Sequence, residues 1–576
     1  MPGPPSNAHY ENMPLEEFIK QPNVIPLYAK DGSVLDKVLK DIPYIRLGKI
    51  VHGDYAVFYM DSRNFFDLFQ VIGTTHAEMI PEAMGLMGRA SLDASNITQV
   101  QQHPYLDLRG RGTLIGIIDT GIDYTKKAFQ FEDSTSKIKY IWDQTIDGTH
   151  PKGFAFGSEY TNEQINQALK SDTPYNVVPS VDTVGHGTFL ASVAASGQDS
   201  DYLGAAPEAE LLVVKLRRLH PFFYDNFVIP ENQENAFSAA DVMLAIQYMV
   251  DKAQELEMPL SICIGLGSNM SGHDGYSILG QYISAISQST GVCICAAAGN
   301  ESNAGHHASG TIHSETTPYD IQIRVPENAN GFPVYIFVNA TDRMSVSVKS
   351  PTGETIPRAV PKSGSLIETK LIFEKSIVRS IYYFPLAETG VEIIVVSIQN
   401  PTPGIWTITL YQDTGINGRF DAWLHVTGLI TPGIEFVVPD PNTTVVVPAT
   451  SIGCITVGAY NDKDNSLYIN SSWGPSRDAQ QKPDLVAPGV DVVGINPMGS
   501  GTMTGTSVAA AITAGACALM MQWGIVEKND VSLDTYRIKA NLIRGCNRDL
   551  DIQYPSPLWG YGKLDLLNTF KGLRSV

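Results

Sequence analysis

Four short runs of apolar residues between positions 110 and 300 constrain the fold of this chain more than any other feature. They occupy residues 114–118, 210–215, 260–264 and 292–296. Such runs are typical of β-strands that are covered on both faces, which occur mainly in parallel sheets. Segments with the apolar spacing of helices lie among them, at residues 188–196 and 239–256. The pattern predicts an α/β domain in which a mostly parallel sheet lies between two layers of helices.

This alternation of strands and helices stops at about residue 309 and resumes at about residue 449. The intervening residues contain many short strand-like segments, separated by Pro, Gly, Asn and Asp, and almost no helical periodicity. Short strands at this spacing favour a β-sandwich, with a jelly roll as its specific topology. We therefore expect a β-sandwich at residues 309–448, inserted into an α/β domain that consists of residues 96–308 and 449–576.

Residues 1–95 indicate a separate and smaller unit of mixed α and β structure. Residues 24–28 and 55–60 have the composition of strands, and Ser33 can serve as the N-cap of a helix. The stretch of residues 83–91 is rich in Gly, Met and Ala. Its composition indicates a linker that leads toward the α/β domain.

The charge balance narrows the classes of partner. The chain has 60 acidic and 40 basic residues, which gives a formal net charge of −20. Nucleic acids and anionic membranes attract basic surfaces, so we expect neither as a partner. Residues 495–526 carry no charge, but small residues dominate them and favour a helix packed inside the protein over a membrane span. Residues 1–13 lack the apolar core of a secretory signal peptide, and we expect synthesis in the cytosol.

The cysteines do not have the spacing of a disulfide framework or of a metal site. They lie in apolar or small-residue surroundings, where free thiols pack as small hydrophobic groups. We expect reduced, buried thiols, no metal ion and no cofactor. The six residues are Cys263, Cys293, Cys295, Cys454, Cys517 and Cys546.

Three short motifs bring chemically active side chains into the predicted α/β domain. Asp119 ends the first apolar run, His186 lies between two glycines at a predicted helix start, and Ser507 begins the small-residue helix. Each has a structural interpretation, as a turn residue, a structural histidine and a helix cap. Together they have one of the known chain orders of a Ser-His-carboxylate triad, Asp then His then Ser. Carboxyl ends of parallel strands are also where open α/β sheets build their sites.

A fourth residue completes this set. Asn300 follows the last apolar run in the sequence Ala-Ala-Gly-Asn. A side-chain amide at that place can donate a hydrogen bond to the negative oxygen that develops during acyl transfer. The backbone N–H of Ser507, at the positive end of its helix, is the expected second donor.

At these residues the chain resembles the subtilisin-like serine proteases, over roughly residues 95–308 and 449–576. The resemblance implies that Asp119 supports His186, that His186 takes a proton from Ser507, and that Ser507 attacks the scissile carbonyl. It further implies that Asn300 holds the oxyanion. A peptide substrate is then expected to bind as an added extended strand. The implied substrate-binding residues are Gly265, Leu266 and Gly267 on the pairing strand, and Ala297, Ala298 and Gly299 along the first specificity pocket.

The chain departs from this family in two places and is thereby similar to a narrower branch. Ser507 is followed by Val-Ala-Ala-Ala without a proline, and Phe189 stands where the family has a histidine. The alanine-rich version is shared with the clostridial Csp-type germination proteases, as are Asp-Thr-Gly-Ile-Asp-Tyr from Asp119 onward and Ile-Trp-Asp-Gln-Thr at residues 141–145. In that branch the insertion is a jelly roll. The N-terminal unit is a prodomain that assists folding, is cut off by the enzyme itself and can stay bound.

Three hypotheses about function follow. The first is an endopeptidase that cuts its own chain within residues 83–100 and then activates a zymogen, such as a spore cortex hydrolase, in association with spores. The second is a non-catalytic sensor or scaffold, because some members of the branch have lost triad residues, although this chain has all three. The third assigns carbohydrate binding to the sandwich, where Trp406 and Trp423 form no recognisable sugar motif.

Overall fold

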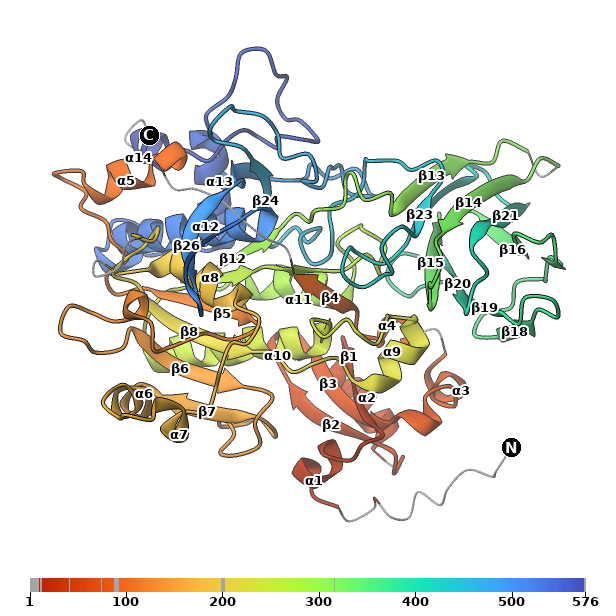
Figure 1. Ribbon diagram of the computed structural model, residues 1–576, viewed down its shortest axis with the longest axis horizontal. Helices are drawn as coiled ribbons and strands as arrows, with labels where there is room; N and C mark the ends of the chain where they lie inside the picture. The colour runs from red at the N-terminus through yellow and green to blue at the C-terminus, as the bar shows by residue number, and fades with distance from the viewer. Residues whose placement is uncertain are drawn as a thin grey trace.

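The four apolar runs form neighbouring strands of one eight-stranded sheet in the computed structural model (Figure 1). The structure describes residues 10, 13–40, 42–73, 75–86, 93–197, 202–314 and 316–573. The sheet order is β25-β24-β12-β10-β5-β8-β6-β7, and every neighbouring pair is parallel except the edge pair of β6 and β7. The strands are β5 (Leu114–Asp119), β6 (Ile138–Asp143), β7 (Ser158–Thr161), β8 (Glu210–Lys215), β10 (Leu260–Ile264), β12 (Val292–Ala297), β24 (Ile455–Tyr460) and β25 (Leu485–Pro488).

Helices cover both faces of this sheet, and the side chains of β5 show why. Ile115 and Ile117 belong to the apolar cluster that contains α8 (His186–Ala195) and α12 (Thr506–Met521). Leu114 and Ile118 point the other way, into the cluster that contains α10 (Ala239–Glu255) and α11 (Ile278–Ile286). The expected three-layer α/β fold is thus confirmed. Smaller helices flank these layers: α5 (Ile97–Gln101), α6 (Asn162–Leu169), α7 (Pro174–Val177), α9 (Pro221–Phe227), α13 (Thr535–Gly545) and α14 (Leu566–Leu573).

The larger part of the uncharged segment 495–526 is a core helix, and its first residues belong to two short strands. Residues 506–526 are long enough and apolar enough to cross a membrane, with a mean hydropathy of 1.6, but 89% of that window is buried inside the protein. The helix packs against β10, β12, β24 and α8. Its small residues permit this closeness, since a Cβ at Gly515 would lie 2.4 Å from the Cβ of Ala205.

The N-terminal unit contains a three-stranded antiparallel sheet of order β1-β3-β2. Its first predicted helix starts earlier than expected, because Asp31 and not Ser33 is the N-cap residue, and the Ser33 hydroxyl binds Asp54 instead. Val34 and Val38 of this helix are more than half exposed. The elements are β1 (Val24–Ala29), β2 (Ile45–Ile50), β3 (Ala56–Asp61), α1 (Leu15–Ile19), α2 (Gly32–Leu39), α3 (Leu68–Ile72) and α4 (Thr75–Glu78).

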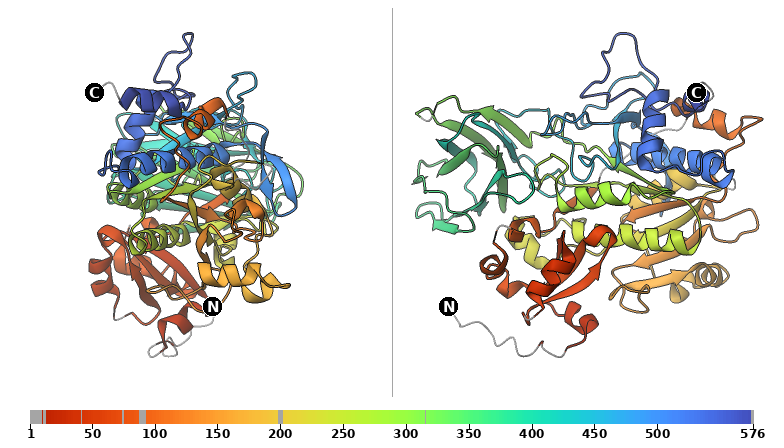
Figure 2. Two further views of the ribbon diagram at one scale, coloured as in Figure 1. Left: turned by 90° about the vertical axis from the view of Figure 1, so that its left-hand side faces the viewer. Right: turned by 180° about the vertical axis from the view of Figure 1, so that it is seen from behind.

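This unit lies against α10 and α11, as the views in Figures 1 and 2 show. The rings of Tyr55 and Tyr282 meet edge to face, with centroids 5.6 Å apart, and Lys49 Nζ lies 3.2 Å from a carboxylate oxygen of Asp251. The start of the predicted linker is a strand, β4 (Ala83–Leu86). It runs antiparallel between β9 (Phe237–Ser238) and β11 (Leu266–Gly267).

The inserted segment forms two antiparallel sheets with one shared apolar core, at one end of the molecule's long axis (Figures 1 and 2). The six-stranded sheet has the order β13-β22-β15-β20-β19-β18, and the five-stranded sheet has the order β17-β16-β21-β14-β23. A sandwich is therefore present as expected, while its jelly-roll topology and the domain boundaries stay predictions. The strands are β13 (His307–Thr311), β14 (Tyr319–Val325), β15 (Gly331–Val338), β16 (Arg343–Lys349), β17 (Thr355–Ile356), β18 (Leu366–Lys370), β19 (Ile377–Tyr383), β20 (Glu392–Gln399), β21 (Gly404–Thr414), β22 (Arg419–Trp423) and β23 (Glu435–Phe436).

The sandwich is attached to the α/β domain through buried aromatic and charged groups. The indole of Trp423 is stacked between the imidazoles of His273 and His307, with centroid distances of 4.2 and 4.7 Å. Asp421, two residues earlier, accepts a 3.1 Å hydrogen bond from Arg477 Nε. Burial opposes ionisation of Asp421, but His307 and the guanidinium of Arg477 outweigh it and lower its pKa to about 2.

Candidate active site

The three residues of the expected triad meet at the carboxyl end of β5, a central strand of the large sheet. Asp119 is the last residue of β5, His186 the first of α8, and Ser507 the second of α12. His186 Nδ1 lies 2.9 Å from both carboxylate oxygens of Asp119, and His186 Nε2 lies 3.2 Å from Ser507 Oγ. All three side chains are buried. His186 thus lies within hydrogen-bond distance of both Ser507 and Asp119. This is the arrangement of nucleophile, base and orienting carboxylate that a Ser-His-Asp triad requires.

Two positions beside this triad require glycine, because neighbouring atoms leave no room for a side chain. A Cβ at Gly187 would lie only 2.2 Å from the carbonyl oxygen of Gly121, in the loop that follows Asp119. A Cβ at Gly265 would lie 3.0 Å from the Cβ of Ser507 and 3.3 Å from His186 Cε1. Side chains at these positions would push apart the elements that carry the catalytic groups.

Asp182, which sequence reasoning missed, fixes the start of α8. This buried carboxylate accepts hydrogen bonds from the backbone N–H of Gly185 at 2.7 Å and of Thr188 at 2.9 Å. It also accepts from the hydroxyls of Thr188 at 2.6 Å and Thr120 at 2.9 Å. Asp182 therefore ties the loop after Asp119 to the helix turn that presents His186. No local motif marks it, because it is a single Asp in an irregular segment.

Asn300 links the end of β12 to the start of α12. Its side-chain oxygen accepts hydrogen bonds from both the backbone N–H and the hydroxyl of Thr506, each at 3.2 Å. The same hydroxyl accepts from the backbone N–H of Gly299 at 3.0 Å. Thr506, the residue before Ser507, thus holds the amide oxygen and fixes the orientation of the amide group. This is the arrangement that an oxyanion donor requires.

The six expected substrate-binding residues lie in two segments, one that includes β11 and one at the end of β12. Leu266 and Gly267 form β11 and pair with Leu86 and Gly85, and Gly265 precedes them next to Ser507. In the second segment Ala297 ends β12, and Gly299 has a φ of +109°. Between them, the backbone N–H of Ala298 donates to the carbonyl of Val457, and the carbonyl of Ala298 accepts from the N–H of Val446. The contact of these residues with a substrate stays a prediction.

Phe189, one of the two departures from the family pattern, has a packing role. Its ring is buried, and a Cβ at Gly494 would lie 2.5 Å from it. Gly494 belongs to β26 (Val492–Asn496), which pairs with β27 (Gly499–Met503) and lies over α8. The aromatic ring fills the space between the hairpin and the helix and leaves the triad intact.

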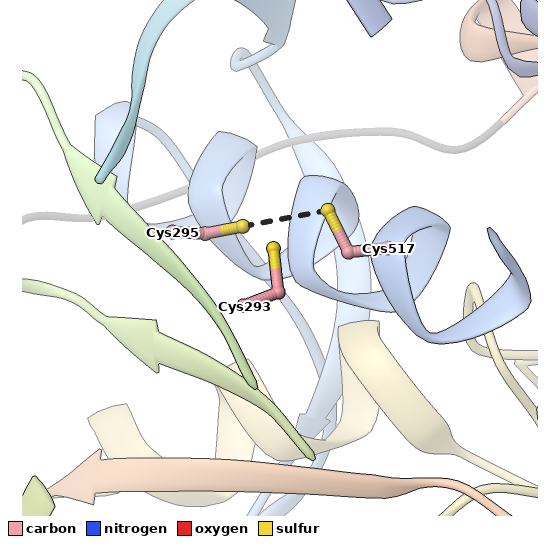
Figure 3. Close-up of side chains that lie close together, drawn as sticks. All are labelled: Cys293, Cys295 and Cys517. Atoms are coloured by element: carbon pink, nitrogen blue, oxygen red, sulfur yellow. Dashed lines mark hydrogen bonds between the residues drawn. The ribbon is translucent and has the colours of Figure 1, made fainter. Parts of the chain in front are cut away.

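Two cysteines of β12 meet a third from α12, more than 200 residues later in the chain, a cluster that the sequence did not indicate. Cys293 and Cys295 lie on β12 and Cys517 on α12, with all three sulfur atoms within 4.8 Å of one another (Figure 3). The sulfurs of Cys295 and Cys517 are 3.7 Å apart. Burial raises the pKa of these two thiols well above the ordinary value. All six cysteines of the chain are buried and free, as expected.

Comparison with known proteins agrees with this geometry. The model of the subtilase family matches residues 110–404 and 433–562, which is more than half of the chain. The chain belongs to the subtilase family of serine peptidases. Its Asp119, His186 and Ser507 all lie within the matched residues.

Individual subtilases are similar to different extents. The CspB protease of Clostridium perfringens is 32% identical, with a TM-score of 0.75 over 84% of this chain and 99% of that protein. Serine protease AprX of Bacillus subtilis is 30% identical over 155 residues, which are 23% of this chain and 33% of AprX. The subtilase-type proteinase RRT12 of Saccharomyces cerevisiae is 30% identical over 109 residues, 18% of this chain and 21% of RRT12. The similarity to the last two thus spans a third or less of their lengths.

Proposed function

We propose that this subtilase is an endopeptidase that hydrolyses peptide bonds of proteins through an acyl-enzyme on Ser507. The observation that carries the proposal is the pair of contacts made by His186, 3.2 Å from Ser507 Oγ and 2.9 Å from the Asp119 carboxylate. Ser507 Oγ attacks the scissile carbonyl while His186 Nε2 takes its proton. Asp119 accepts the Nδ1–H and stabilises the imidazolium that forms.

The later steps use the same groups. The negative oxygen of the tetrahedral intermediate receives hydrogen bonds from the amide of Asn300 and the backbone N–H of Ser507. His186 then returns the proton to the leaving amine, and the amine departs. A water molecule, deprotonated by His186, attacks the ester on Ser507 and releases the second product.

We further propose that the first protein cut is the chain itself. β4 occupies the position of an extended peptide, because it adds an antiparallel strand between β11 and β9. Its backbone is held there by the pairing of Gly85 with Gly267 and of Leu86 with Leu266. The chain therefore enters the site from its own N-terminal unit, which supports the role of this unit as a prodomain.

The register of β4 on β11 supports one choice for the peptide bond that is cut. Residues 87–92 of the expected window 83–100 lie outside the described residues, and the last described pairs before them are those of Gly85 and Leu86. Each step forward on β4 is a step backward on β11, and we propose that this register continues by one residue, which would set Met87 opposite Gly265. Gly265 is the residue that lies against Ser507. We propose that the Met87–Gly88 bond is cut.

From the same register we propose which side chain the enzyme prefers at the fourth residue before the cut bond of other substrates. Met84, the fourth residue before this bond, is buried in the apolar cluster that also contains Leu266 and Phe237. Displacement of β4 would leave an apolar pocket for the corresponding residue of a second protein. A long, unbranched apolar side chain fits such a pocket best.

Mass spectrometry of the wild type and the Ser507→Ala variant tests the proposal. We expect two wild-type fragments, the larger beginning at Gly88, and an intact chain for Ser507→Ala because the attacking oxygen is absent. Ser466→Ala, in an exposed turn, should be cut like the wild type. An intact wild-type chain without peptidase activity would contradict the proposed function, and cleavage of the Ser507→Ala chain would show that another protease cuts it.

For the physiological substrate we propose a zymogen such as a spore cortex hydrolase, with the enzyme associated with spores. The similarity to the CspB protease and to the germination branch supports this assignment. Incubation of the cleaved enzyme with a purified cortex hydrolase zymogen tests it. We expect one new N-terminus that is absent with Ser507→Ala, and an uncut zymogen beside efficient peptide hydrolysis would refute the substrate but not the activity.

A further inference from the structure

We propose that Cys293, Cys295 and Cys517 form a binding site for one soft, monovalent metal ion of the Cu(I) class. The three thiols point toward one another from two different elements, as Figure 3 shows. Cys293 and Cys295 are two residues apart on β12, so both lie on the face that α12 covers. The third ligand comes from α12, more than 200 residues later in the chain.

The distances suit metal coordination. A metal–sulfur bond is about 2.3 Å, so the sulfurs of a tetrahedral or trigonal site lie about 3.8–4.0 Å apart. The sulfurs of Cys295 and Cys517 are already 3.7 Å apart, and all three fall within 4.8 Å of one another. An ion at the centre would need the longest separation to shrink by less than about 1 Å.

The donor set decides the class of ion. Thiolates are soft ligands, which select Cu(I), zinc or iron–sulfur clusters over Mg²⁺ or Ca²⁺. Structural zinc takes four ligands, whereas this group contains three among the described His, Cys, Asp and Glu side chains. A three-coordinate site favours Cu(I). Binding replaces thiol protons, so uptake should release protons and weaken at low pH.

Such an ion would connect the two parts of the catalytic domain. β12 leads to Asn300, and Ser507 lies in the first turn of α12, so the ion would join the elements on either side of the inserted sandwich. An ion that binds the folded chain alone stabilises it by mass action. The inference does not depend on peptidase activity, because it concerns the packing of these two elements.

The test is an anaerobic titration of the full-length Ser507→Ala chain with Cu(I) against a colorimetric Cu(I) chelator. This background prevents self-cleavage. Because the site is buried, Cu(I) is added both to the folded chain and during refolding. We expect one ion per chain and a higher melting temperature. No uptake under either condition, or uptake without a stoichiometry of one, would overturn the proposal.

Matched variants locate the ion. Cys517→Ala and Cys293→Ala should lose uptake, whereas Cys454→Ala and Cys546→Ala, which remove buried thiols outside the cluster, should retain it. Equal uptake by all four variants would contradict the assignment. If the cluster variants fail to fold, X-ray absorption on the loaded parent chain decides, because three sulfur neighbours are expected and nitrogen or oxygen neighbours would refute the site.

Discussion

Asn300 combines two tasks at the level of a single residue. Its amide oxygen holds the first turn of α12 through Thr506, which leaves the amide NH2 group as the proposed donor to the oxyanion. Ser507, the next residue, depends on the same turn for its position. In the proposed mechanism, one side chain would thus position the nucleophile and stabilise the charge that the nucleophile creates.

We predict that Asn300→Ala lowers kcat about 10²–10³-fold with little change in KM, because the lost hydrogen bond forms mainly in the transition state. The measurement is peptide hydrolysis by the cleaved enzyme. Thr506→Val serves as the matched variant, since it removes the hydroxyl that binds Asn300 but keeps the amide donor. Its loss should be smaller. A raised KM with unchanged kcat in Asn300→Ala would speak against an oxyanion role.

The sequence predicted the site residues that have distinctive neighbours and missed those that do not. Asp119, His186, Asn300 and Ser507 have flanking glycines or apolar runs that the backbone approach requires. Asp182 has no such flanks, because its role comes from five hydrogen bonds that only the folded chain brings together. The thiol cluster escaped for the same reason, since its members are brought together only by the packing of α12 on β12.

At the level of elements, the buried strands could be predicted and β4 could not. β5, β8, β10 and β12 are apolar runs, because helices cover both of their faces. β4 contains Ala, Met, Gly and Leu, a composition that indicated a linker. It is a strand because β9 and β11 supply hydrogen bonds on both sides, and tertiary pairing overrides weak local propensity.

Glu392 on β20 provides a pH-dependent test of the sandwich. Its side chain is buried, and burial raises its pKa from 4.5 to about 7, although the backbone N–H of Met344 donates to it at 2.8 Å. The folded state therefore holds its proton more tightly than the unfolded state. Ionisation then costs stability increasingly as pH rises from about 4.5 to about 7, up to a limit of about 3 kcal/mol.

We predict that Glu392→Gln raises the melting temperature at pH 8 and leaves it nearly unchanged at pH 4.5. The substitution keeps an acceptor for Met344 and removes the charge. Thermal unfolding followed by circular dichroism at several pH values measures the effect. Glu368→Gln, at an exposed position of β18, is the control and should change little at any pH. A pH-independent effect of Glu392→Gln would show that the charge is not the cause.

At the level of the whole molecule, the three structural units contact one another. Lys30 of the N-terminal unit lies 3.1 Å from Gln281 on α11 and 2.8 Å from Glu388 of the sandwich. Exposed ion pairs of this kind contribute about 0–1 kcal/mol. The larger contribution comes from the apolar cluster that Tyr28, Val57 and Met84 share with α10 and α11.

We therefore predict that the N-terminal fragment stays bound after cleavage. It should co-elute with the larger fragment in size-exclusion chromatography and inhibit peptide hydrolysis until mild denaturant or proteolysis removes it. Lys30→Ala should not release it, because the ion pair is exposed, whereas Met84→Lys should weaken retention by placing a charge in the apolar cluster. Separate elution of the wild-type fragments would contradict this prediction.

The place of α12 near the end of the chain has a consequence for protein synthesis. The ribosome makes the N-terminal unit, β5 with Asp119, β12 with the following Asn300, and the whole sandwich before it reaches Ser507. A chain that is terminated before residue 507 therefore lacks the proposed nucleophile, even if its other units have folded. By the time the nucleophile leaves the ribosome, β4 has already been available for pairing with β9 and β11. The order of synthesis itself would thus keep a new enzyme from cutting its neighbours.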